Sequence, residues 1–260
     1  MKVSNILATR LARRTNNKGL TLIELLVVLV ILIALAGVLI PQLPNMLTRT
    51  HAAAASTNIP EANKRIQEFE QLYFKQPANL DNLVNGAALV DYLPTATPFT
   101  ALALDADTSD ALEEAGITTV SQLVATAGAF TADQNATFNP YSGTITTVAA
   151  AVNVAQVTEA DVEALIRPDA GAGDVYVAFG IGQASELTGR TLSDAPYHFG
   201  EGPNSAPEAV YARYLAIYKV EDDAGGALEK AAFIGVLALH DDGLANANAH
   251  IAEFFETTEL

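Results

Sequence analysis

The feature that most constrains the fold of this chain is an apolar run near its N-terminus, residues 20–40. The run contains one charged side chain, Glu24, and its other breaks in apolar character are Thr21 and Gly37. As an α-helix rising about 1.5 Å per residue it would be about 30 Å long, the thickness of the hydrocarbon core of a bilayer. Five Lys or Arg residues and no acid precede it, so the positive-inside rule keeps that end in the cytoplasm. We therefore expect a single-pass helix with an extracytoplasmic body.

Two ordinary interpretations of this run leave its acid unexplained. One is a secretory signal peptide with an A-x-A cleavage site at Ala34-Leu35-Ala36, but apolar residues continue past that site to Ile40. The other is a plain single-pass anchor, which accounts for length and orientation. An unpaired acid in an apolar span costs on the order of a few kcal/mol. Glu24 therefore requires a partner.

The residues around the acid, GLTLIE at 19–24, resemble the N-terminal signature of type IV pilins and type II secretion pseudopilins. The resemblance implies that a prepilin peptidase cuts between Gly19 and Leu20 and N-methylates Leu20, while the apolar helix stays in the product. It also implies a partner for Glu24, the new terminal ammonium of a neighbouring subunit in a filament core. A carboxylate in an apolar bundle is tolerable when paired with an opposite charge, and Glu24 would then set the axial register between subunits.

Two other features of this segment fit the same family, and two depart from it. Pro41 falls where the family often places a helix-kinking proline, and Gly37 is the other weak point of the helix. Alternatively, Pro41 and Pro44 simply mark the exit from the membrane. Leu20 stands where Phe or Met is commoner, and the 19-residue basic leader, residues 1–19, is longer than many. These departures weaken assignment to a particular subclass.

The rest of the chain is predicted to divide into an assembly helix, residues 20–57, and a globular α+β body, residues 58–260. Within the body, residues 59–74 carry an apolar stripe at helical spacing, and Pro60 suits a first helical turn. We therefore expect the long N-terminal helix to be bent or broken near residues 56–60. The stripe consists of Ile59, Ala62, Ile66, Phe69 and Leu72 or Tyr73. In pilins this stem helix packs on an antiparallel sheet, so the resemblance implies a pilin-like fold.

Residues 77–170 are predicted to form a polar, acidic insert. No Lys or Arg occurs at residues 76–166, so this region lacks the cations that neutralise phosphates, and we expect no nucleic-acid binding. A helix is predicted within residues 109–128, whose LEEAGITTVSQLV stretch looks like half of a helix-hairpin-helix unit. Glu113 and Glu114 flank that hairpin, which favours a packing role. A capped helix is predicted to follow Thr158, with Asp161 three residues on.

The last third of the chain predicts antiparallel strands. β-branched and aromatic residues are frequent at 174–181, 209–220 and 230–239, and turn sequences separate the last two segments. A three-stranded meander is the simplest arrangement. After a turn at 241–243, apolar positions at Leu244, Ile251 and Phe254 or Phe255 indicate a short closing helix.

Candidate metal or catalytic residues are few. Asp222, Asp223, Asp241 and Asp242 could bind calcium if their two turns meet in space, and some pseudopilins bind calcium near the C-terminus. The alternative is that these are solvated turn carboxylates. His240 and His250 show no metal-ligand spacing, and the chain has no cysteine. With no catalytic motif or cofactor fingerprint, we expect a protein that is not an enzyme.

These observations predict a structural subunit of a type IV pilus-like or type II secretion pseudopilus filament. Its partners would be copies of itself or other pilins, prepilin peptidase, an inner-membrane assembly platform and the bilayer. It would begin in the bacterial inner membrane and pass into a periplasmic or surface filament. The lack of a cysteine-closed C-terminal loop favours a pseudopilin. The alternatives are an anchored or secreted binding protein outside any filament, and a minor tip subunit whose insert contacts cargo or DNA.

Overall fold

The computed structural model describes residues 21–40, 43–96, 98–125, 143–168, 173–198, 210–223 and 226–256. The chain forms two compact units, residues 1–46 and 47–260. The predicted cleavage site, Gly19–Leu20, and the predicted kink at Pro41 lie outside the described residues.

Two helices account for the N-terminal part. Helix α1 spans Leu22–Leu39 and helix α2 spans Leu43–Tyr73. A break near residues 56–60 is wrong, because α2 continues through Pro60, and a bend there stays a prediction. Buried residues follow one another at helical spacing on both sides of this proline, at Ala52, Ala55, Ile59, Ala62, Ile66 and Phe69. Packing of this continuous stripe outweighs the hydrogen bond that proline removes from a helix interior.

Nine of the described strands form one mixed sheet, in the order β11-β10-β9-β8-β1-β5-β6, and β7 pairs with both β8 and β4. These strands are β1 (Leu80–Asn82), β4 (Phe99–Ala103), β5 (Thr119–Gln122), β6 (Thr144–Thr147), β7 (Asn153–Val157), β8 (Val175–Gly180), β9 (Leu215–Asp222), β10 (Gly226–Leu239) and β11 (Leu244–Ala245). A separate hairpin joins β2 (Val84–Asn85) to β3 (Ala88–Leu89). Three further helices are α3 (Ala106–Ala115), α4 (Glu159–Leu165) and α5 (Ala247–Glu256).

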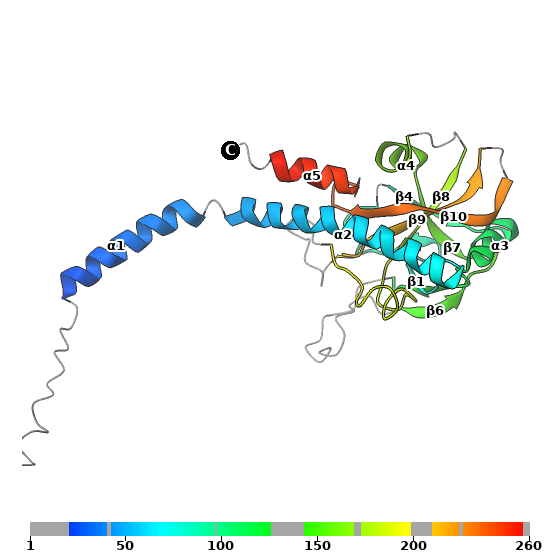
Figure 1. Ribbon diagram of the computed structural model, residues 1–260, viewed down its shortest axis with the longest axis horizontal. Coiled ribbons are helices and arrows are strands. Elements are labelled where there is room, and N and C mark those ends of the chain that lie inside the picture. Colours follow the sequence, from blue (N-terminus) through cyan, green and yellow to red (C-terminus); the bar gives the residue numbers. More distant parts are fainter. Residues whose placement is uncertain are drawn as a thin grey trace, which may run out of the picture. The chain divides into compact units, whose positions relative to one another are not determined.

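The predicted meander is present. Strand β8 pairs antiparallel with β9, and β9 pairs antiparallel with β10. The predicted closing helix is α5, and the predicted capped helix is α4, where the Thr158 hydroxyl accepts a hydrogen bond from the Asp161 amide. The chain is therefore α+β, with an N-terminal helix and a large sheet (Figure 1).

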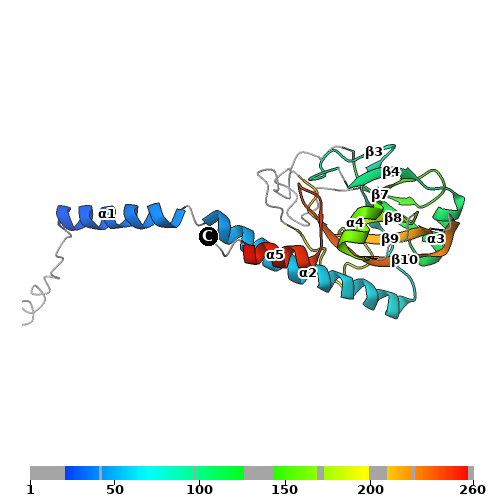
Figure 2. The same cartoon turned by 90° about the horizontal axis from the view of Figure 1, so that it is seen from above.

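The centre of this sheet is buried on both faces, as strand β8 shows, where alternate residues point to opposite faces. Along β8, Val177 and Phe179 belong to one core cluster, and Tyr176 and Ala178 belong to a second one. The stripe of α2 contributes to the first cluster, together with residues of α3. Helix α2 runs alongside the sheet and α5 lies beside α2, as both views show (Figures 1 and 2).

Residues 77–170 contribute directly to the sheet. They supply β1, β4, β5, β6 and β7, so the acidic segment is built into the body rather than appended to it. The helix predicted within 109–128 is only half right, because α3 ends at Ala115 and β5 begins at Thr119. Gly116 caps α3 with a left-handed φ of 103°, and a Cβ there would lie 2.6 Å from Lys75 Cβ. The helix-hairpin-helix interpretation therefore fails, because the expected second helix is a strand.

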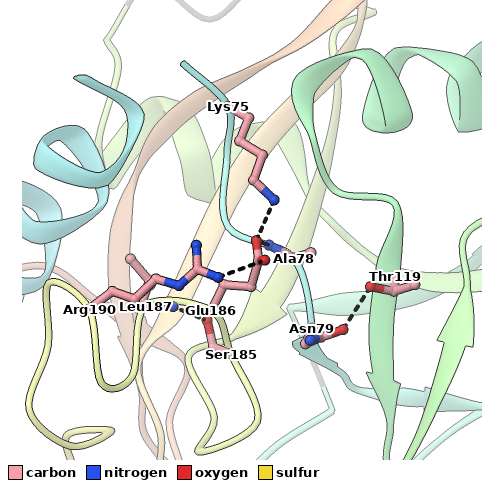
Figure 3. Close-up of polar contacts among 8 residues, drawn as sticks. All are labelled: Lys75, Ala78, Asn79, Thr119, Ser185, Glu186, Leu187 and Arg190. Atoms are coloured by element: carbon pink, nitrogen blue, oxygen red, sulfur yellow. Dashed lines mark hydrogen bonds and ion pairs between the residues drawn. The ribbon is translucent and has the colours of Figure 1, made fainter. Parts of the chain in front are cut away.

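A carboxylate fixes the connection between α2 and β1. Glu186 forms an ion pair with Lys75, whose Nζ lies 2.7 Å from its Oε2, and accepts a hydrogen bond from the Ala78 amide at 3.2 Å. Arg190 lies 3.5 Å from the other carboxylate oxygen. Figure 3 shows the Glu186 carboxylate between the Lys75 ammonium and the Arg190 guanidinium. This junction places the end of the stem helix at the start of the sheet.

Candidate functional site

The first candidate site is the N-terminal helix α1, which has no polar face. Its described large apolar side chains are all exposed within this chain, from 49% at Val27 to 85% at Leu22. A helix that is apolar on every side needs an apolar surrounding. Among the described residues, however, no helix is both long enough and apolar enough to cross a membrane.

The acid of this segment has a local partner. Thr21 is the N-cap of α1, and Glu24 Oε2 accepts hydrogen bonds from the Thr21 amide at 2.7 Å and from its hydroxyl at 2.8 Å. The Glu24 amide in turn donates to Thr21 Oγ1 at 3.3 Å. These reciprocal bonds form a capping box. The sequence signal, Thr-x-x-Glu at a helix start, was available in residues 21–24, but sequence reasoning assigned Glu24 only an intermolecular partner.

Gly37 lies inside α1, where nothing lies within 4 Å of a Cβ added to it. It is thus free of close packing within its own unit. Its proposed role as a kink point, with Pro41, stays a prediction.

The four aspartates considered for calcium do not come together. Asp222 ends β9 and Asp223 follows it in the hairpin turn that precedes β10, whereas Asp241 and Asp242 follow the opposite end of β10. Strand β10 has 14 residues, which at about 3.3 Å each separates the two turns by roughly 40 Å. The condition for a shared calcium site, two turns meeting in space, is therefore not met.

Three histidines do come together, although sequence spacing gave no sign of it. His198 follows the bridge between Tyr197 and Arg213, His240 follows β10, and His250 lies on α5. All three are buried, and one ring nitrogen from each lies within 4.8 Å of the others. The Nε2 atoms of His240 and His250 are 3.2 Å apart. The elements that carry these residues are distant in sequence, so a local spacing rule could not detect them.

Burial makes two of these rings, His198 and His250, hard to protonate. Desolvation, with repulsion from His240 and the other histidines, lowers the pKa of His198 to about 2. Desolvation and His240 lower the pKa of His250 to about 4. Both rings are therefore neutral near pH 7. His250 Nδ1 lies 3.4 Å from Glu253 Oε2, which leaves its Nε2 facing His240.

Comparison with known families identifies one match. Residues 14–40 match the prokaryotic N-terminal methylation motif, which is the type IV pilin and pseudopilin signature. The resemblance inferred from residues 19–24 is thereby confirmed, and the chain carries the motif of a prepilin peptidase substrate. No curated protein matched the chain, and no solved structure matched it.

Proposed function

We propose that this chain is a structural, non-catalytic subunit of a type IV pilus-like or type II secretion pseudopilus filament. The observation that carries the proposal is the methylation motif at residues 14–40. Within that motif, prepilin peptidase would cut between Gly19 and Leu20 and methylate the new terminal amine. The lack of a cysteine-closed loop favours the pseudopilus.

The all-round apolar surface of α1 supports assembly through this helix. Its described large apolar side chains, each at least 49% exposed, would be covered by the equivalent helices of neighbouring subunits. Before assembly, residues 20–40 would hold the subunit in the inner membrane, with the basic leader in the cytoplasm. The assembly platform would then draw it into the filament.

Glu24 would have one partner in the isolated chain and another in the filament. In the isolated chain its carboxylate accepts bonds from Thr21. In the filament it would pair with the terminal ammonium of Leu20 of a neighbouring subunit, where charge pairing compensates for the apolar surroundings. Assembly would then exchange a local hydrogen bond for an intermolecular ion pair.

Intact-mass analysis and N-terminal sequencing test this proposal. The wild-type chain and Gly19→Ala would each be expressed with and without a prepilin peptidase and recovered from membranes. A wild-type product that starts at Leu20 and carries one extra methyl group, with Gly19→Ala left uncut, is expected.

Two other products would contradict the proposal. A product starting at Gly37 would mean that signal peptidase removes the helix and that the body is secreted. A product starting at Met1 with the peptidase present would mean a plain anchor. Either result would favour the alternative, in which the body acts alone as a binding protein outside any filament.

A further inference from the structure

We propose that His198, His240 and His250 form a binding site for one divalent transition-metal ion of the zinc class. The inference concerns the body of the protein and does not rest on the filament role. It differs from the calcium hypothesis in its residues, its place in the fold and its ligand atoms.

The spacing of the ring nitrogens fits a metal centre. Zinc binds imidazole nitrogen at about 2.0–2.1 Å, so two ligands of a tetrahedral ion lie about 3.4 Å apart. The Nε2 atoms of His240 and His250 are 3.2 Å apart. All three candidate nitrogens lie within 4.8 Å of one another, so closure around an ion would shorten no nitrogen–nitrogen distance by more than about 1.4 Å.

An orphaned nitrogen also points to a ligand. His198 is 4% exposed, and its Nε2 is buried without a hydrogen-bond partner. A buried polar atom left unsatisfied costs on the order of 1–3 kcal/mol, and native proteins rarely keep one without an ion, a water or a functional reason. Coordination to a metal would satisfy this atom.

Two acidic side chains, Asp242 and Glu253, lie beside the cluster. A pocket next to it is lined by His240, Asp242, His250 and Glu253, together with Ala245 and Ala249. Glu253 lies against Nδ1 of His250, the position from which a carboxylate orients a metal-binding imidazole. The acids would attract a cation to the pocket, and the pocket leaves room for a water as a fourth ligand.

The ligand set selects the metal. Three imidazoles and no thiolate suit Zn²⁺ and its neighbours in the transition series, whereas Ca²⁺ and Mg²⁺ prefer oxygen. The ligands come from a loop, the end of β10 and helix α5. A bound ion would therefore fasten α5 to the end of the sheet.

Calorimetric titration of the full chain in detergent tests the site. After treatment with a chelator, ZnCl₂ would be titrated into the wild type, His198→Gln, His240→Gln, His250→Gln and the control Asp110→Asn. Asp110 is exposed on α3 and is not part of the cluster. We expect one ion per wild-type chain. Each cluster variant should bind more than about 100-fold more weakly, since loss of outer-shell partners alone costs 10–100-fold. Asp110→Asn should bind as the wild type does.

Two further readouts keep the test decisive. A large excess of Ca²⁺ should not displace the zinc, whereas it would displace zinc held by surface carboxylates. Hydrogen exchange of residues 247–256 should slow when zinc is added to the wild type. Absence of zinc binding by the wild type, or zinc binding that the three variants retain, would overturn the proposal. The wild-type titrations decide it even if a variant fails to fold.

Discussion

The Tyr211 hydroxyl donates a hydrogen bond of 2.8 Å to the Asp81 carboxylate, from a residue 130 positions along the chain. Asp81 is 5% exposed. Desolvation raises its pKa to about 7, although the bonds from Tyr211 and Ser121 and the charge of Arg213 act in the opposite direction. The carboxyl group is thus an internal acid that titrates near neutral pH.

This raised pKa predicts a pH-dependent stability. Between the unfolded pKa of about 4 and the folded pKa of about 7, the folded state binds more protons, so stability falls as pH rises. The shift corresponds to a few kcal/mol across that window. Asp81→Asn should flatten the dependence, as urea unfolding at pH 4.5, 6 and 7.5 (approximate settings around these pKa values) would measure. The exposed Asp110→Asn is the control, and an unchanged slope in Asp81→Asn would refute the assignment.

Gly180 is required by the same network. A Cβ at this position would lie 1.6 Å from the Tyr211 hydroxyl oxygen. The Tyr211 ring is fully buried, so it has no space to move aside. Gly180→Ala should destabilise the body by about 1–3 kcal/mol or more in urea unfolding. Gly226→Ala is the matched control, because nothing lies within 4 Å of its added Cβ. Equal stability of the two variants would contradict the packing described here.

Substitution to Ala should lower the stability of the body strongly at the centre of the α2 stripe and only slightly at its exposed edge. Ile66 is fully buried in the cluster that includes β8 and β9 residues. Ile66→Ala should cost about 3 kcal/mol through lost burial and an unfilled cavity. Leu72, which is 61% exposed on the same helix, should tolerate Ala within about 0.5 kcal/mol. Thermal unfolding of both variants checks this, and similar effects would mean that the stem does not pack on the sheet.

Loss of the Glu186 charge should lower the stability of the body, because this carboxylate holds the connection between α2 and β1. Glu186→Gln removes its ion pair with Lys75 and weakens its contact with the Ala78 amide. We expect a loss of about 1 kcal/mol, at the lower end for charge-assisted bonds because Lys75 is 38% exposed. The exposed pair Lys230–Glu70, at 3.7 Å, offers the control Glu70→Gln, which should have no measurable effect. A double-mutant cycle with Lys75→Met would isolate the pair, and a coupling of zero would exclude it as a stabilising contact.

Glu24 can be tested so that its two partners are separated. Glu24→Gln keeps a side chain that completes a capping box but removes the charge, whereas Thr21→Val removes the capping hydroxyl and keeps the charge. If charge pairing drives assembly, Glu24→Gln should abolish filaments and Thr21→Val should retain them. Sheared-filament yield and electron microscopy would measure this. Filaments from Glu24→Gln together with their loss in Thr21→Val would show that capping is the essential role.

Local patterns explain which parts of the fold sequence analysis predicted. The apolar stripe of α2, the meander β8-β9-β10 and helix α5 each depend on periodicity within a short segment. The first half of the 109–128 prediction held for the same reason, since Asp105 caps α3 and Gly116 ends it. The second half failed because Thr119–Gln122 pairs with β1 and β6, and such pairing depends on residues far away in the chain.

The prepilin-type N-terminal motif could be recognised from the sequence, because its predicted cleavage site, its acid and its apolar run are consecutive residues. The three-dimensional fold was needed to show that α2 passes unbroken through Pro60, that Asp81 meets Tyr211, and that His198, His240 and His250 converge. These outcomes come from strand pairing and helix packing between distant segments. Their free energy depends on burial and distance in space, which no spacing along the chain encodes.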